Sequence, residues 1–125
     1  MPEFSQLSLS RLTTCDERLQ KLFMEVIKDT DCTIICGNRN QVDQDQAFHD
    51  GFSKLKWPNG PHNSMPSLAV DVMPSPINWN DATGIKAFSD KVKAVALAQG
   101  LDLDYGGDWQ GFVDNDHYQV KRVAC

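Results

Sequence analysis

Apolar residues recur along this chain with two different periods, and these periods predict alternating helices and strands. Three segments have apolar residues three and four positions apart, as in an amphipathic helix: residues 14–27, 42–52 and 80–100. Four shorter segments are apolar or alternate in the manner of strands: residues 32–36, 67–73, 101–105 and 117–123. Thr14 and Glu17 have the spacing of a capping box, and Gly100 suits the end of a helix.

The connections between these segments predict how the strands pair. Residues 57–66 hold three prolines, a glycine and two asparagines, which indicates a loop. Gly106 and Gly107 predict a turn, so the strands near the end of the chain resemble a hairpin. We therefore expect an α+β fold in which a small antiparallel sheet packs with about three helices. With 125 residues and no repeat or linker, residues 1–125 are expected to form one domain.

Composition narrows the choice of partners. The net charge is −5, and an acidic surface repels phosphates and anionic lipids, so nucleic acid and membrane surfaces are not expected partners. No apolar run approaches the roughly 20 residues of a membrane helix. The N-terminus, MPEFSQLSLSRL, lacks the basic and apolar regions of a signal peptide. None of the four cysteines lies in a CxxC pair, which favours reduced thiols outside any metal site.

Two histidines and two aspartates form the candidate chemistry. His62 lies in the proline-rich loop, and Asp71 lies in the apolar strand SLAVDVM, on the face opposite its valines. That face is either solvent or a site, and the alternation alone does not choose between them. His117 begins another strand, and two His with one carboxylate are a common zinc set that leaves a position open for catalysis. Asp114 lies three residues before His117 and could take a proton from the attacking water.

The order of several motifs resembles the zinc D-Ala-D-Ala carboxypeptidase group, which includes phage endolysins that are L-alanyl-D-glutamate peptidases. Its metal-binding strand is similar to PHNSMPSLAVDVMP, with the matching residues His62, Ser67, Ala69 and Asp71. Its second half is similar to the segment that holds Asp114, His117 and Tyr118, which follows YGGDW at 105–109. An upstream segment matches at Gly37, Arg39, Gln44, Gly51, Ser53 and Lys54.

This sequence also departs from the group's commoner pattern. His62 and Asp71 are nine residues apart rather than seven, which places two extra residues near Met65 and Pro66. Gly60 stands where the pattern has a serine, and Asp116 stands where a proline is often seen. These changes leave the three predicted ligands in place.

The resemblance implies a role for each matched residue. One Zn²⁺ per chain would be held by His62, Asp71 and His117, with Asp114 as general base. Arg39 would point into the site and stabilise the oxyanion of the reaction. Four further residues are expected to contact the substrate or form a wall of the cleft: Gln44, Ser53, Trp109 and Tyr118.

The function that this resemblance implies is zinc-dependent hydrolysis of peptidoglycan stem peptides, by a phage endolysin that cleaves the L-Ala–D-Glu bond. A D-Ala-D-Ala carboxypeptidase or dipeptidase of the same group is the near alternative. A non-catalytic, zinc-stabilised cell-wall-binding module is the alternative from another class, but a structural site would fill all four zinc positions. We expect a monomer that stays in the host cytoplasm until it is released to the cell wall.

Overall fold

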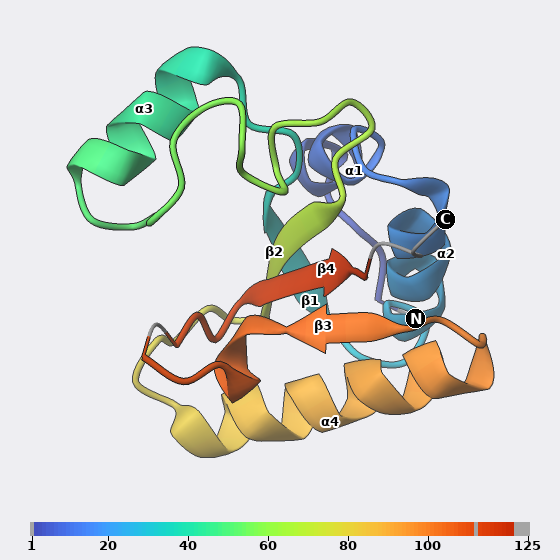
Figure 1. The fold of residues 1–125 in the computed structure, drawn as a ribbon. Helices are drawn as coiled ribbons and strands as arrows, with labels where there is room; N and C mark the ends of the chain where they lie inside the picture. Colours follow the sequence, from blue (N-terminus) through green and yellow to red (C-terminus); the bar gives the residue numbers. More distant parts are fainter. Residues whose placement is uncertain (1, 112, 122–125) are drawn as a thin grey trace.

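The computed structural model describes residues 2–111 and 113–121. In this part of the chain helices and strands alternate, and α4 runs below the sheet in Figure 1 while α3 stands apart at the upper left. The elements are α1 (Gln6–Leu12), α2 (Glu17–Val26), β1 (Cys32–Cys36), α3 (Gln41–His49), β2 (Ala69–Pro74), α4 (Ala82–Ala98), β3 (Leu103–Tyr105), the 3₁₀ helix η1 (Gly106–Asp108) and β4 (His117–Val120).

The four strands form one sheet in the order β1-β2-β4-β3, and every neighbouring pair is antiparallel. This arrangement confirms the predicted α+β class and its antiparallel sheet. The register of the central pair places Asp71 of β2 directly opposite His117 of β4. The pairing of β1 with β2 contains an irregularity between Ile34 and Cys36.

One face of the sheet packs against α2 and α4 to form the hydrophobic core. Tyr118 lies at its centre, with its ring 4.8 Å from Tyr105, 5.5 Å from Phe23 and 6.5 Å from Phe88 between centroids. Such edge-to-face and stacked aromatic contacts add to the free energy gained by burial. No helix of the described residues is both long and apolar enough to cross a membrane. The core therefore holds one face of the sheet in place and leaves the other face for a site.

The predicted helix boundaries are partly wrong at the N-terminal end. Thr14 is not a helix cap: its hydroxyl donates to the Arg11 carbonyl and accepts from the backbone N–H of Asn38. Asp16 caps α2 instead, by accepting from the backbone N–H of Arg18. The sequence pattern also missed α1, because this seven-residue helix buries few side chains and so shows little periodicity.

The remaining boundaries agree more closely. The predicted helix 42–52 ends earlier, at His49, and the predicted helix 80–100 is α4. Gly100 follows α4 with a φ of 70°, a left-handed conformation that favours glycine at this position. The predicted end of the last strand, at residue 123, lies outside the described residues.

Candidate active site

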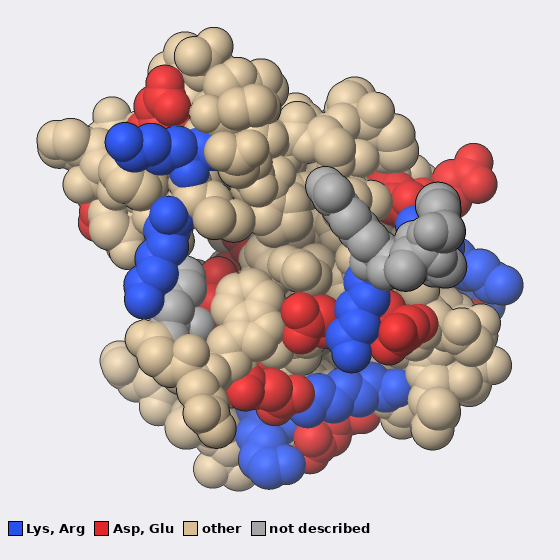
Figure 2. Space-filling model, viewed as in Figure 1, with Lys and Arg blue, Asp and Glu red and all other residues tan. Residues whose placement is uncertain are grey.

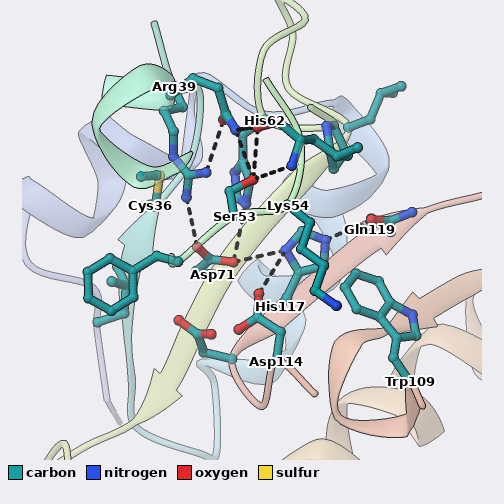
Figure 3. A pocket seen from close by; sticks show the side chains of 18 of the residues that line it. Cys36, Arg39, Ser53, Lys54, His62, Asp71, Trp109, Asp114, His117 and Gln119 are labelled. Carbon is teal, nitrogen blue, oxygen red and sulfur yellow. Dashed lines mark hydrogen bonds and ion pairs between the residues drawn. The ribbon is translucent and has the colours of Figure 1, made fainter. Parts of the chain in front are cut away.

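The sheet and one loop bring the predicted chemistry together at the floor of a cleft (Figure 3). Asp71 comes from β2, His117 from the start of β4, and His62 from the loop that precedes β2. Asp71 Oδ1 lies 3.3 Å from Nε2 of His62 and 3.2 Å from Nδ1 of His117. Asp114 reaches the same point, because its Oδ2 lies 3.8 Å from His117 Nδ1. The face of β2 that holds Asp71 is therefore a site and not free solvent.

Burial makes this cluster costly unless its charges are paired. His62, Asp71 and His117 are 3%, 7% and 4% exposed. Burial alone would raise the pKa of Asp71, but the adjacent His62 and His117 hold it well below its usual range. Burial would lower the pKa of His62, yet the Asp71 carboxylate outweighs it and raises this pKa to about 10. The Asp71 carboxylate is therefore held as an anion between the two imidazoles.

Each imidazole is oriented by a hydrogen bond on its far side. His62 Nδ1 lies 2.8 Å from the carbonyl oxygen of Gly37, which can only accept, so Nδ1 carries the proton. His117 Nε2 lies 2.7 Å from Oε1 of Gln119 and donates to it. These bonds turn His62 Nε2 and His117 Nδ1 toward Asp71, as in metal sites whose histidines donate their other N–H to an acceptor.

The donor atoms fit a metal ion. His62 Nε2 is buried and makes no hydrogen bond to any described residue. Buried polar atoms rarely lack a hydrogen bond, because leaving one unsatisfied destabilises the fold. Within the described residues, two sets of possible ligands have their ligand atoms within 4.8 Å of one another. One set is Cys36, His62 and Asp71, and the other is Asp71, Asp114 and His117. The predicted trio is thus divided between two sets that share Asp71.

Cys36 lies in the cleft, where the sequence analysis placed no cysteine. The cysteines were expected to stay outside the metal site, and that expectation stays a prediction, but the Cys36 thiol lies within 4.8 Å of possible ligand atoms of His62 and Asp71. Cys15 and Cys32 are buried in the core, and all three of these thiols are free.

Asp116 is a buried carboxyl beside the site, 7% exposed. Burial, followed by the neighbouring Asp114 and Asp71, raises the pKa of Asp116 to about 9. This shift favours the neutral form of Asp116 and so limits the negative charge next to Asp71. This explains how the chain tolerates a carboxyl at a position where the related pattern often has proline.

Gln44 joins Arg39 to the loops above the cleft. Its Oε1 accepts from Arg39 Nη1 and from Asn63 Nδ2, both at 3.0 Å. Its Nε2 donates to Ser53 Oγ at 2.9 Å and to the Leu55 carbonyl at 2.6 Å. Because an amide side chain has two acceptor positions and two N–H groups, Gln44 has none left for a substrate. The structure thus gives Gln44 a positioning role in place of the predicted substrate contact.

Arg39 points into the site, as the resemblance implied. Its Nη2 lies 3.6 Å from Oδ2 of Asp71, and its side chain is 17% exposed. The backbone supports this orientation, because the Arg39 N–H donates to the His62 carbonyl at 2.8 Å. Ser53 also lines the cleft, where its hydroxyl donates to the Leu55 carbonyl at 3.1 Å.

The two predicted aromatic walls have different outcomes. Trp109 lines the cleft, with its ring 4.9 Å from that of His117 and its Nε1 donating to Asp104 at 3.0 Å. Tyr118 does not line the cleft and is 0% exposed, so its predicted substrate contact is wrong. Successive residues of a strand face opposite sides of a sheet. Because His117 faces the cleft, its neighbour Tyr118 faces the core.

Sequence reasoning missed two residues that hold the site, Gln119 and Asn63, and the reason for a third, Gly106. Gln119 orients His117, and no motif pointed to it. Asn63 ties the His62 loop to Gln44 and to the Arg39 carbonyl. A Cβ at Gly106 would clash with the Asp114 carbonyl and with Cβ of His117. The glycine in YGGDW was noticed, but the close packing that requires it is visible only in the fold.

The cleft is large enough for a peptide. Its volume is about 990 Å³, and a hollow is visible in Figure 2 between the α3 region and the surface over α4 and β3. The segment 52–55, Trp79 and Trp109 are among the residues that line it. A concave, partly apolar cleft with convergent polar groups at its floor is typical of a substrate site.

Comparisons with known proteins agree with this geometry. A family model described as phage L-alanyl-D-glutamate peptidase matches residues 2–123. The crystal structure of the Serratia marcescens L-Ala D-Glu endopeptidase ChiX is similar, with a TM-score of 0.80 and 19% sequence identity. That similarity covers 95% of this chain and 90% of ChiX, and at this identity it shows the fold. A sequence comparison with curated proteins gives no match.

These findings confirm the predicted resemblance, the α+β fold and the prediction of a peptidase. The roles of the individual residues and the identity of the metal stay predictions.

Proposed function

The chain belongs to the phage L-alanyl-D-glutamate peptidase family, and we propose that it is a zinc peptidase that cleaves the L-Ala–D-Glu bond of peptidoglycan stem peptides. The observation that carries this proposal is the buried Asp71, with Nε2 of His62 and Nδ1 of His117 both turned toward its Oδ1. Hydrogen bonds to the Gly37 carbonyl and to Gln119 support those orientations.

His62, Asp71 and His117 would hold one zinc ion per chain. A zinc ion held there supplies Lewis acidity, which polarises the scissile carbonyl and makes water acidic enough to attack at neutral pH. Zinc suits this donor set because imidazole nitrogens and a carboxylate are among its usual ligands, and three protein ligands are typical of catalytic sites. The buried Nε2 of His62, which makes no hydrogen bond to any described residue and faces Asp71 Oδ1 at 3.3 Å, is further support for an ion at this point.

Asp114 and Arg39 would carry the proton transfer and the charge stabilisation. The Asp114 side chain is 28% exposed, so its carboxylate is open to the cleft as well as to the metal position. It would take the proton from the attacking water and pass it to the leaving amine. Arg39 would donate to the oxyanion that develops on the scissile carbonyl, because its guanidinium lies beside Asp71 and stays charged at any working pH.

The cleft supports a peptide substrate rather than a purely structural metal site. Ser53 and Trp109 line it and would contact the stem peptide, next to the metal position. A structural site would leave no need for an open cleft over its ligands. We further propose that the protein is a monomer, and that as an endolysin it stays in the host cytoplasm until the membrane is opened.

Digestion of purified peptidoglycan tests this function. Mass analysis of the fragments should find new free L-alanine carboxyl groups and new D-glutamate amino groups. Release of terminal D-alanine alone would show a carboxypeptidase instead. Bound zinc without any hydrolysis would show a non-catalytic binding module. The control is His117→Ala, which should release no fragments under the same conditions.

A further inference from the structure

A β-bulge brings a cysteine thiol into the active site. In β1, Cys32 and Ile34 are 3% and 0% exposed and belong to the core. Their partners in β2 are Pro74 and Val72, but the register then shifts, so that Cys36 pairs with Asp71. In a regular strand Cys36 would face the same side as Ile34; the extra residue in the bulge turns it toward the cleft, which it lines.

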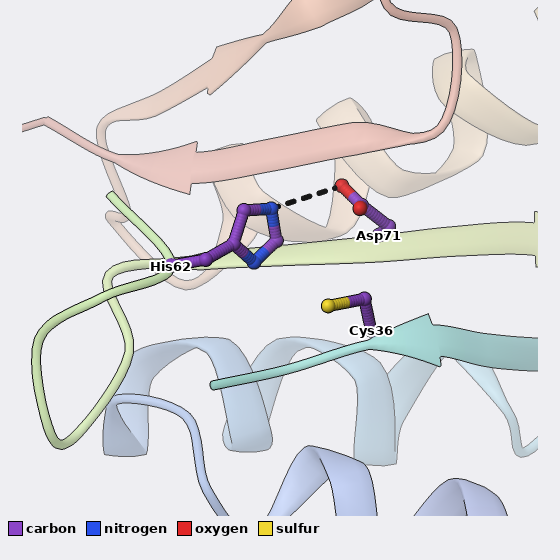
Figure 4. Close-up of side chains that lie close together, drawn as sticks. All are labelled: Cys36, His62 and Asp71. Atoms are coloured by element: carbon purple, nitrogen blue, oxygen red, sulfur yellow. Dashed lines mark ion pairs between the residues drawn. The ribbon is translucent and has the colours of Figure 1, made fainter. Parts of the chain in front are cut away.

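In this position the thiol lies among proposed metal ligands. Figure 4 shows Cys36, His62 and Asp71 facing a common point, and their ligand atoms lie within 4.8 Å of one another. The second, independent observation is His62 Nε2, which is buried, has no hydrogen-bond partner among the described residues and points toward Asp71. A buried nitrogen without a hydrogen bond is costly, and a bound metal ion would remove that cost. Cys36 lies beside the position that such an ion would occupy.

We propose that Cys36 is a ligand of the metal ion in the substrate-free enzyme. This inference rests on the proposed zinc site and adds a fourth protein ligand to His62, Asp71 and His117. As the sulfur–metal bond forms, the thiol proton is released to solvent, and the resulting thiolate is a ligand that zinc binds strongly. The resting site would then be closed, and Cys36 would take back a proton from solvent and leave the metal when water and substrate occupy the position.

Cobalt substitution tests the bond directly, without relying on activity. Co²⁺ bound to the wild-type protein should show a sulfur-to-cobalt charge-transfer absorption in the near ultraviolet. Cys36→Ser and Cys36→Ala should bind Co²⁺ without this absorption. Cys32→Ala is the matched control and should keep it, since Cys32 is buried in the core and belongs to neither of the two ligand sets. Competitive zinc titration should show at least about a 10-fold loss of affinity in both Cys36 variants.

Thiol labelling gives a second measurement on the same residue. Zinc should slow alkylation of Cys36 in the wild-type protein, measured by mass spectrometry of the peptide that contains it. The same zinc should have no effect on Cys36 in His62→Ala.

The outcomes separate this inference from the proposed function. Cobalt that binds without the charge-transfer absorption, or an absorption that persists in Cys36→Ser, would overturn the role of Cys36 and leave the zinc peptidase standing. A wild-type protein that binds neither cobalt nor zinc would overturn both proposals.

Discussion

Replacing Gln119 with leucine should weaken metal binding, although Gln119 is not a proposed ligand. Its Oε1 lies 2.7 Å from Nε2 of His117, and this hydrogen bond directs Nδ1 of the same ring toward Asp71. Leucine has a similar volume but no acceptor. The variant therefore leaves the His117 N–H without an acceptor. The ring then loses the hydrogen bond that holds it in the metal-binding orientation.

The expected loss of zinc affinity in Gln119→Leu can be estimated from this hydrogen bond. Acceptors that orient metal-binding histidines typically contribute about 10–100-fold to metal affinity. This corresponds to about 1.4–2.7 kcal/mol of binding free energy. The lost hydrogen bond accounts for about 1 kcal/mol of it, and the freed rotation of the ring accounts for the rest. Gln119→Glu keeps an acceptor at the same position, so its zinc affinity should stay well above that of Gln119→Leu.

Competitive titration of zinc against a chromophoric chelator measures this loss. Gln99→Leu is the matched control, because Gln99 lies at the end of α4 and its amide donates only weakly, at 3.3 Å, to the Lys21 carbonyl. The unfolding temperature of each metal-free variant shows whether the change acts through the metal site or through the fold. Equal zinc affinity in Gln119→Leu and the wild-type protein would refute the reasoning, because it would show that His117 needs no such orientation.

Three further predictions concern the predicted zinc ligands, the general base Asp114 and Arg39. His62→Ala, Asp71→Ala and His117→Ala should each lose zinc and activity together, and metal analysis that finds full occupancy in one of them removes that residue from the ligand set. Asp114→Asn should keep zinc while kcat falls about 10²–10⁴-fold, and steady-state kinetics on a defined muropeptide measure the loss. Arg39→Lys should lower kcat by roughly 10²–10³-fold at unchanged zinc content, whereas a rise in KM alone would show a substrate-holding role.

The predicted ligands were accessible from the sequence, but the residues that orient them were not. His62, Asp71 and His117 could be named because histidines and a carboxylate in a known order indicate zinc chemistry. Gln119 is an ordinary polar residue in a strand, and only the antiparallel register shows that its amide meets the far side of the His117 ring. Asn63 could not be predicted for the same reason. Its partner Gln44 is distant in sequence, and the two side chains meet only because the loop folds against α3.

The sequence analysis misplaced Tyr118 and Cys36, for different physical reasons. Tyr118 could have been placed in the core from the sequence, since strand alternation puts it opposite the cleft-facing His117. Cys36 could not have been placed in the cleft by the same rule. Alternation from the core residue Ile34 predicts a buried Cys36, and the β-bulge reverses that prediction. A bulge has no reliable sequence pattern here, because the strand CTIIC has apolar residues on both faces.

The unusual spacing between His62 and Asp71 shows which parts of the site tolerate change. Asp71 is placed by its pairing with His117, and His62 by its bond to the Gly37 carbonyl, so neither position depends on the length of the chain between them. The two extra residues are expected near Met65 and Pro66, and Met65 is 72% exposed, so added length there would not disturb the ligands. Gly60 has no such freedom, because a Cβ there would lie 2.7 Å from Oδ1 of Asn63. The serine of the commoner pattern would therefore displace Asn63, which ties the His62 loop to Gln44.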